Sequence, residues 1–368
     1  MRFNWVVVGA GFTGLTFAHQ KACQGKSVLV VEQRDHIGGN AWDEYNEVGV
    51  LDHIYGPHIF HTNSNSVVNF LSRFTEWRPY THFVRAEIEG KLVPIPFNLN
   101  SIDLVFGDPL ASTLRGVLVD EYGYGSRVPI LKLRQHERPE IKFLADFVYK
   151  NVFEGYTRKQ WGVAPEDLAP SVTARVPVSV SRDDRYFGDR YQIMPKRGYA
   201  HLFRKMADVP GLKVLLKTTW QSIKSDIETD NILFTGPIDE FFEYKFGDLP
   251  YRSLRFEREH TTREVNWRHS VTNFPNSLNC TRTTSMRALS GQKAEFNTLI
   301  SEYPEGYKRG SNIPYYPVPN DANQDLYRRY KELAERQKTT LFAGRLAEYQ
   351  YYNMDQAVAR ALMLAEKY

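Results

Sequence analysis

The stretch "NWVVVGAGFTGLTFAHQKACQGKSVLVVEQR" (residues 4–34) decides the fold of this chain. Its apolar run over residues 5–8 predicts a strand that is buried on both faces, and "SVLVVE" (residues 27–32) predicts a second one. The segment between them has the apolar periodicity of a helix. A strand, a turn, a helix and a strand in this order form a Rossmann-like βαβ unit, so the predicted fold class is α/β.

The turn after the first strand carries three glycines in G-x-G-x-x-G spacing. Gly9 allows the chain to turn tightly, Gly11 lets a pyrophosphate approach the backbone, and Gly14 lets the helix pack closely on the strand. The second strand ends in Glu32, which can accept hydrogen bonds from the hydroxyl groups of an adenosine ribose. Because every part appears in order, the stretch predicts a dinucleotide-binding site.

A second glycine pair, in "QRDHIGGNAW" (residues 33–42), favours FAD over NAD. Gly38 and Gly39 allow another close approach of the backbone to the ligand, which a plain NAD domain does not need. Arg34 follows the acidic residue directly, and Asn40 follows the glycines. In these features the segment is similar to the FAD-binding fold of the glutathione-reductase type.

The far end of the chain is expected to complete this cofactor site. Residues 340–343 read as a strand that ends at Gly344, and a polar loop follows. Asn353 is a good N-cap for a helix over residues 354–367, which starts at Met354. The N-terminus of such a helix would point at the cofactor and close the fold over it.

Composition narrows the function classes. The 368 residues, 42% of them hydrophobic, suffice for two or three units with a sizeable core. The net charge of +4 suits an anionic small molecule and excludes a basic nucleic-acid-binding stripe. Cys23 and Cys280 form neither a disulfide framework nor a CxxC metal site. With no signal peptide and no apolar run of roughly 20 residues, we expect a cytoplasmic protein without membrane insertion.

Two histidines, His58 and His61, lie three residues apart in "YGPHIFHT" (residues 55–62). Such a pair can bind a metal, move protons or line a pocket for a flat ligand. The metal interpretation lacks a convergent set of Cys, Asp or Glu ligands, so we expect no metal. Gly56 would give the backbone close access to a ring, and Pro57 would stiffen the approach.

With these features in place, the chain resembles the bacterial UDP-galactopyranose mutases along nearly its whole length. The segments that carry the resemblance are "YGPHIFHTN" (55–63), "GYTRKQWG" (155–162), "RVPV" (175–178), "DDRYFGDRYQ" (183–192), "TGPIDEFFEYKFGDLPYRSLRFE" (235–257), "EYP" (302–304), "PYYPV" (314–318) and "GRLAEYQYY" (344–352).

The resemblance implies a flavoenzyme that interconverts UDP-galactopyranose and UDP-galactofuranose without net redox change. The FAD of such an enzyme acts in its reduced form, and its N5 atom is the nucleophile on the anomeric carbon. It further implies a nucleotide-sugar substrate, NAD(P)H or another reductant, a homodimer and a link to surface polysaccharides.

The resemblance also implies roles for individual residues. Expected catalytic residues are Arg175, Arg282 and His61, the arginines as clamps on the pyrophosphate. Expected substrate-binding residues are Tyr156, which should stack on the nucleobase, Trp161, which should border the sugar, and Tyr186, Arg252, Asn273, Tyr315 and Tyr351. Expected cofactor-binding residues are Gly9, Gly11, Gly14, Glu32, Arg34, Gly39, Asn40, His58, His61, Gly344, Arg345, Asn353 and Met354. Glu302 matches a position near the flavin or the sugar.

The family plan implies a discontinuous Rossmann-like FAD-binding domain with a helical insertion and an antiparallel sheet domain. The FAD-binding domain would comprise residues 1–79, 193–246 and 319–368, the insertion residues 97–165, and the sheet domain residues 80–96, 166–192 and 247–318. Helical periodicity over residues 110–123 and 142–153, and strand patterns over residues 250–260, 264–274 and 293–304, agree with this plan.

Four departures from the family pattern leave the sugar open. His82 replaces an asparagine, Thr283–Arg287 lack an acid and a lysine, Asn353 replaces an aspartate, and Pro57 replaces an alanine. A dTDP-6-deoxyhexose, a GDP-heptose or UDP-N-acetylgalactosamine therefore stays an alternative to UDP-galactose. An FAD-dependent oxidoreductase and a non-catalytic binding protein are alternatives of other classes.

Overall fold

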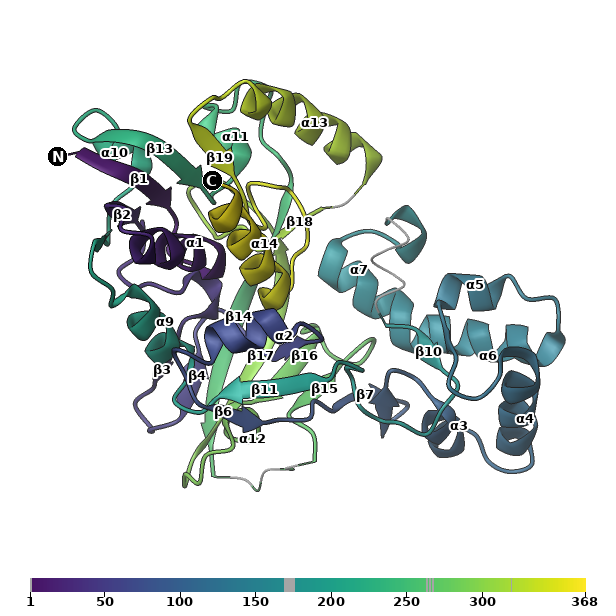
Figure 1. Ribbon diagram of the computed structural model, residues 1–368. Helices are drawn as coiled ribbons and strands as arrows, with labels where there is room; N and C mark the ends of the chain where they lie inside the picture. The colour runs from purple at the N-terminus through teal and green to yellow at the C-terminus, as the bar shows by residue number, and fades with distance from the viewer. Residues whose placement is uncertain (1, 169–175, 263, 265, 267, 319) are drawn as a thin grey trace.

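Figure 1 shows the computed structural model of the chain, in which a parallel sheet with its helices, a long mixed sheet and a helical lobe lie side by side. The structure describes residues 2–168, 176–262, 264, 266, 268–318 and 320–368. Within these ranges, no helix has the length and apolar character needed to span a membrane.

The predicted βαβ unit is confirmed. Its strands are β1 (Arg2–Val8) and β2 (Val28–Val31), and its helix is α1 (Phe12–Cys23). The sheet has the strand order β12-β2-β1-β13-β19, and all of these pairs are parallel. The added strands are β12 (Leu212–Leu215), β13 (Glu228–Phe234) and β19 (Thr340–Phe342).

Helices cover both faces of this sheet because its strands are apolar on both faces. Val7 belongs to a core shared with α1, α9 (Tyr199–Ala207) and α14 (Met354–Lys367). Val6 belongs to a smaller core on the other face, against which α10 (Trp220–Ile223) packs. The predicted α/β class is therefore confirmed.

Helix α14 begins at its predicted N-cap. The backbone N–H of Asn353 donates to Oε1 of Gln356 at 2.9 Å, as in a capping box. Asp355, in the first turn, accepts a hydrogen bond from the Thr62 hydroxyl at 2.7 Å. The start of α14 is thus tied to the strand that carries His61, β5 (Phe60–Thr62).

The long sheet in the middle of Figure 1 has the strand order β18-β14-β17-β16-β15-β7-β8. Its pairs are antiparallel as predicted, except that β15 and β7 run parallel. Its strands are β7 (Val84–Ile88), β8 (Lys91–Ile95), β14 (Tyr251–Thr261), β15 (Val271–Asn273), β16 (Arg282–Ser285), β17 (Asn297–Gly306) and β18 (Tyr316–Pro317). Of the strand predicted over 264–274, the structure shows β15, while residues 265 and 267 lie outside the described ranges.

The helical lobe, at the right of Figure 1, surrounds its own core, which includes the buried side chains of Ile102, Leu114 and Leu144. Its helices are α3 (Leu99–Val105), α4 (Leu110–Tyr122), α5 (Ile130–Arg134), α6 (Pro139–Val148) and α7 (Gly155–Trp161). A π-helix, η2 (Tyr149–Glu154), joins α6 to α7. The helix predicted over 142–153 therefore changes its geometry at Tyr149.

The remaining elements connect these parts. They are η1 (Gly39–Ala41), β3 (Asp43–Tyr45), β4 (Leu51–His53), α2 (Asn65–Leu71), β6 (Trp77–Pro79), β9 (Arg127–Val128), η3 (Pro165–Asp167), β10 (Val178–Ser179), β11 (Tyr191–Pro195), α11 (Ile238–Phe241), α12 (Met286–Ser290) and α13 (Asp321–Glu335).

Candidate active site

Two glycine-rich segments face each other with backbone and no side chains between them: Gly9, Gly11 and Gly14 in the turn after β1, and Gly38 and Gly39 after β2. We call this the cradle. A Cβ atom on Gly39 would lie 3.1 Å from the Cα of Gly11, so the two segments face each other without side chains. Gly9 has a φ of +100°, and a Cβ on Gly14 would lie 1.9 Å from the carbonyl oxygen of Gly9. Such a cradle admits a pyrophosphate against backbone N–H groups.

Glu32 closes one side of this cradle. Its carboxylate accepts hydrogen bonds from the backbone N–H of Ala10 at 2.8 Å and of Arg34 at 3.0 Å. The Arg34 guanidinium donates to Asn40 at 2.8 Å and lies 4.2 Å from the centre of the Tyr55 ring. Within the described chain its buried Nη1 has no hydrogen-bond partner, which leaves a cationic donor for a ligand.

Gly344 and Arg345 bring the C-terminal segment to the same region. Gly344 has a φ of +98°, and a Cβ there would lie 3.1 Å from Oγ1 of Thr13 in α1. Arg345 donates to the carbonyl oxygens of Tyr315 at 3.3 Å and Tyr352 at 2.7 Å. Met354 packs against the core of the parallel sheet.

His58 is held as a neutral acceptor. Its Nδ1 lies 2.7 Å from the Gly56 carbonyl oxygen, so Nδ1 carries the proton and Nε2 the lone pair. Burial lowers the pKa of His58 to about 4, and the charges of Arg345 and Arg282 act in the same direction. Behind it, Nδ1 of His53 accepts from the His58 backbone N–H at 3.0 Å.

His61 has a different environment. Its Nδ1 lies 2.8 Å from a carboxylate oxygen of Asp189, whose other oxygen accepts from Asn63 at 2.8 Å. Its ring stacks on Phe187 at 3.6 Å between centroids, and His82 lies 5.5 Å from the same Phe187 ring. His58 and His61 therefore have different hydrogen-bond partners, Gly56 and Asp189.

His82, the first departure from the family, is 4% exposed. The Tyr80 hydroxyl lies 3.1 Å from its Nδ1 and 2.6 Å from the Ser270 hydroxyl, which forms a short chain of hydrogen bonds. Burial lowers the pKa of His82 to about 3, with the charges of Arg282 and His61 adding to the effect. This position is therefore a neutral imidazole beside aromatic rings.

Arg282 is the main cation of the site. It donates to Glu302 at 3.0 Å, and the side chains of these two residues are 28% and 3% exposed. Burial acts to lower the pKa of Arg282, but the combined interactions with Glu302, Tyr156 and Tyr316 raise that pKa, so the guanidinium stays charged. The buried atoms Nε of Arg282 and Oδ1 of Asn273 lack hydrogen-bond partners in the described chain and are available to a ligand.

Aromatic side chains gather around Arg282. Burial raises the pKa of Tyr156, and Arg282, Glu302, Tyr186 and Tyr351 all interact with its hydroxyl electrostatically. The structure therefore brings together five residues that the sequence placed in the active site.

Tyr316, which was not predicted, joins this group. Its ring stacks on Tyr351 at 5.2 Å between centroids and lies 6.2 Å from that of Trp161. The predicted Tyr315 is 4% exposed and packs edge-on against Phe256, and Arg34 is the charge that most affects its pKa. The Tyr315 ring also lies 6.1 Å from that of Tyr316, so it stands between the Arg34 side of the cradle and the Arg282 cluster.

Two other predicted residues need separate mention. Arg252 donates to the backbone carbonyl oxygens of Gln160 at 2.9 Å and Lys159 at 3.1 Å, so its guanidinium binds the end of α7. Arg175 lies outside the described residues.

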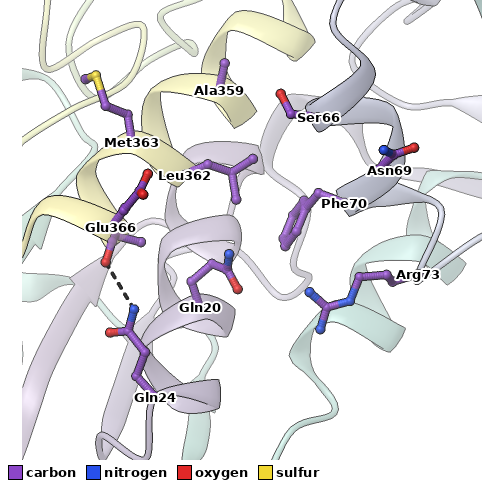
Figure 2. Close-up of a pocket in the computed structure, with 11 residues that line it drawn as sticks. Gln20, Gln24, Ser66, Asn69, Phe70, Arg73, Ala359, Leu362, Met363 and Glu366 are labelled. Atoms are coloured by element: carbon purple, nitrogen blue, oxygen red, sulfur yellow. Dashed lines mark hydrogen bonds between the residues drawn. The ribbon is translucent and has the colours of Figure 1, made fainter.

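Two hollows of the surface lie away from these residues. Figure 2 shows the side chains that line one of them between α1, α2 and α14, among them Gln20, Arg73 and Leu362. Its volume is about 670 Å³. A second, of about 500 Å³, is lined by Arg85, Asp184 and other residues. Neither contains a residue of the predicted site.

Comparison with known proteins decides the family. A family model described as UDP-galactopyranose mutase matches residues 151–351, more than half of the chain. The chain belongs to the UDP-galactopyranose mutase family. It is accordingly an isomerase. A model of the NAD(P)-binding Rossmann-like domain matches residues 7–74, which contain the cradle.

Members of the mutase family match the chain over almost its full length. A probable UDP-galactopyranose mutase of Klebsiella pneumoniae is 34% identical, over 99% of this chain and 94% of its own. A dTDP-fucopyranose mutase of Escherichia coli is 31% identical, over 99% of this chain and 97% of its own. A crystal structure of reduced UDP-galactopyranose mutase shares the fold, with a TM-score of 0.76 at 16% identity, over 100% of this chain and 93% of its own.

Proposed function

We propose that this mutase-family protein interconverts the pyranose and furanose forms of UDP-galactose with FAD as its cofactor. The observation that carries the proposal is the Arg282–Glu302 pair inside a cluster of tyrosines, near the neutral acceptor His58. A charged guanidinium with an open donor suits a pyrophosphate, and the aromatic rings suit a nucleobase and a sugar.

The residues of the cradle fit FAD. The facing backbones of Gly11 and Gly39 leave space for the pyrophosphate, Glu32 has lone pairs left for a ribose, and the open Nη1 of Arg34 can donate to a phosphate or a ribose oxygen. Asn353 and Met354 would place the N-terminus of α14 at the cofactor. When bound and reduced, FAD would supply the nucleophilic nitrogen for the anomeric carbon.

The side chains of this chain would then bind and orient the substrate. Arg282, together with Arg175 from outside the described residues, would hold the pyrophosphate while the bond to the sugar breaks. Tyr156 would cover the nucleobase and Trp161 would border the sugar, which excludes water from the reaction. His58 would accept a hydrogen bond through Nε2 on the cofactor side.

The wider setting is part of the same proposal. We expect NAD(P)H or another reductant to keep the flavin reduced, and a homodimer in the cytoplasm. We retain the predicted division into an FAD-binding domain, a helical insertion and a sheet domain as the working boundaries.

A dTDP-6-deoxyhexose is the second candidate substrate. The similarity to the dTDP-fucopyranose mutase is close to that for the UDP-galactose enzymes, at 31% against 34% identity. The rings of Tyr186 and Phe187 around the neutral His82 form an apolar wall that would accept the methyl group of a 6-deoxy sugar.

The test is a chromatographic assay of the FAD-loaded protein, oxidised and dithionite-reduced, against UDP-galactose, dTDP-fucose, a GDP-heptose and UDP-N-acetylgalactosamine. We expect conversion of UDP-galactose by the reduced protein only. Equal activity in both redox states would contradict the flavin role, a preference for dTDP-fucose would support the second candidate, and net consumption of an oxidant would indicate an oxidoreductase.

A further inference from the structure

Helix α7 carries Tyr156 and Trp161, which the proposed function assigns to the nucleobase and the sugar. It continues α6 and the π-helix η2 without a break, at the edge of the helical lobe and away from the core of the parallel sheet (Figure 1). The lobe therefore anchors the N-terminal end of α7, and contacts with the long sheet fix the helix relative to Arg282.

The side chain of Lys159 makes one such contact. Its Nζ donates to the carbonyl oxygens of Phe274 at 2.7 Å, of Leu278, and of Cys280 at 3.5 Å. These acceptors lie in the loop between β15 and β16, which is bounded by Asn273 and Arg282. The ammonium group of Lys159 thus joins helix α7, which carries Tyr156, to the loop that precedes Arg282.

Arg252 makes the second contact, from strand β14. Its guanidinium donates to the carbonyl oxygens of Lys159 and Gln160 at 3.1 and 2.9 Å, which are among the last of α7 and have no partner inside the helix. Gly162, with a φ of +76°, ends the helix, and a Cβ there would lie 3.2 Å from the Arg252 guanidinium. Arg252 therefore holds the C-terminal end of α7.

The third contact is a close approach of backbones. A Cβ on Gly155 would lie 2.5 Å from the carbonyl oxygen of Pro275 and 2.2 Å from Oδ1 of Asn276, so the first residue of α7 touches the same loop directly. Asn276 also donates to the carbonyl oxygen of Lys150, inside the π-helix, at 3.3 Å. The loop between β15 and β16 therefore contacts both the π-helix and the start of α7.

We propose that Lys159 and Arg252 are positioning residues that hold α7 on the long sheet and set the distance between Tyr156 and Arg282. We call these two sets of hydrogen bonds the clasp. This inference rests on the proposed function for the identity of the ligand, but the clasp itself is a property of the protein. Both cations bind backbone carbonyl oxygens, so neither needs to touch the substrate. Loss of the clasp should raise KM and leave the rate of the bound complex largely unchanged.

The neighbouring Arg158 offers a matched control. It lies on the same helix, it is exposed, and its contact is a surface ion pair with Glu154 at 3.3 Å. Such exposed pairs contribute little to stability. Arg158→Met therefore removes a cation of similar length from α7 without touching the clasp.

The experiment uses the FAD-loaded full chain and the variants Lys159→Met, Lys159→Arg, Arg252→Lys and Arg158→Met. Hydrogen–deuterium exchange of residues 149–162 and the dissociation constant of UDP are measured for each. We expect Lys159→Met to speed exchange in that segment and to weaken UDP at least tenfold, with most of the affinity restored in Lys159→Arg. Arg252→Lys should shift exchange and affinity in the same direction as Lys159→Met, because lysine lacks the planar fork in which Nε and Nη2 each reach one carbonyl oxygen.

Two outcomes would overturn the clasp: exchange of residues 149–162 unchanged in Lys159→Met, or an equal effect of Arg158→Met. A rise in KM should accompany kcat within about threefold of wild type. If Lys159→Met does not fold, Arg252→Lys takes its place: unchanged exchange of residues 149–162 in that variant would overturn the clasp. A wild type that shows the expected exchange but converts no nucleotide sugar would refute the proposed function and leave the clasp intact.

Discussion

Arg282 combines a fixed orientation, set by its ion pair with Glu302, with a donor that remains for a ligand. Glu302 holds one nitrogen at 3.0 Å, while Nε has no partner in the described chain. An arginine in this state keeps a fixed orientation and still has donors for phosphate oxygens. A lysine would keep the charge but lose the planar fork.

We therefore predict that Arg282→Lys lowers kcat/KM by roughly 30- to 150-fold, since a charge-assisted hydrogen bond contributes about 2–3 kcal/mol. The flavin content should be unchanged, as judged by visible absorbance, because Arg282 is not part of the cradle. The control is Arg255→Lys, a surface arginine of β14 that pairs with Glu257 and Glu305. Loss of flavin in Arg282→Lys would move this residue to a structural role.

At the level of residues, the sequence motifs indicated which segments lie near the candidate site, but not which side chains of a segment point into it. "PYYPV" predicted Tyr315, but the neighbouring Tyr316 is the ring that stacks on Tyr351. Adjacent residues of an extended segment point in opposite directions, so a motif cannot select between them without the register of the strand. The His61–Asp189 contact joins residues 128 positions apart, and no local pattern predicts it.

Gly14, near the start of helix α1, packs directly against the backbone of Gly9 in the cradle. We predict that Gly14→Ala abolishes FAD binding and lowers the melting temperature, because its Cβ would lie 1.9 Å from the carbonyl oxygen of Gly9. The control is Gly116→Ala in the middle of α4, where no atom lies within 4 Å of the added Cβ. That change should stabilise the protein by about 0.5–1 kcal/mol. A Gly14→Ala protein that retains flavin would contradict the close-packing argument.

At the level of elements, local patterns predicted those that depend on local sequence. The βαβ unit, α4 and α14 with its Asn353 cap are confirmed because capping and periodicity decide them. The helix predicted over 142–153 becomes a π-helix from Tyr149, where Asn276 binds the carbonyl oxygen of Lys150. The departure thus coincides with a contact to a loop more than a hundred residues away, which no local pattern reports.

At the scale of the whole molecule, the candidate site is assembled from segments far apart in the sequence. Tyr156 comes from the helical lobe, Arg282 from the long sheet, and His58 from the loop after the cradle. The family resemblance predicted this convergence, while composition and periodicity did not, because they report on single elements. The assigned roles stay predictions until variants are measured.

Buried histidines give the whole molecule a pH-dependent stability. Burial lowers the pKa of His53 to about 3, of His58 to about 4 and of His82 to about 3. Below their unfolded value near 6.5, the unfolded chain binds protons that the native protein does not. The native protein therefore has its full stability with respect to these three groups above pH 6.5, and it loses that stability as the pH falls below this value.

Asp43 works in the opposite direction. Burial raises its pKa to about 6, despite hydrogen bonds from the backbone N–H groups of Tyr199 and Ala200, so that protonation below pH 6 favours the native state. Between pH 7 and pH 5, protonation of Asp43 should add about 1 kcal/mol to the free energy of unfolding. Each of the three histidines should lower the same free energy by about 2 kcal/mol over this range. The three histidines outweigh Asp43 because each of their pKa values is displaced further. Burial also raises the pKa of Asp52, Asp239 and Glu240 and lowers that of His19 and His269, which adds to both sides of the balance.

We therefore predict that the melting temperature of the FAD-loaded protein falls steadily from pH 7 to pH 5, and that unfolding at pH 5 takes up protons. His82→Phe should make this fall less steep, because it removes one of the histidines that burial keeps neutral. Calorimetry at several pH values, in buffers of different ionisation enthalpy, measures both quantities. A melting temperature that is constant or rises as the pH is lowered would show that His53, His58 and His82 are not kept neutral by burial.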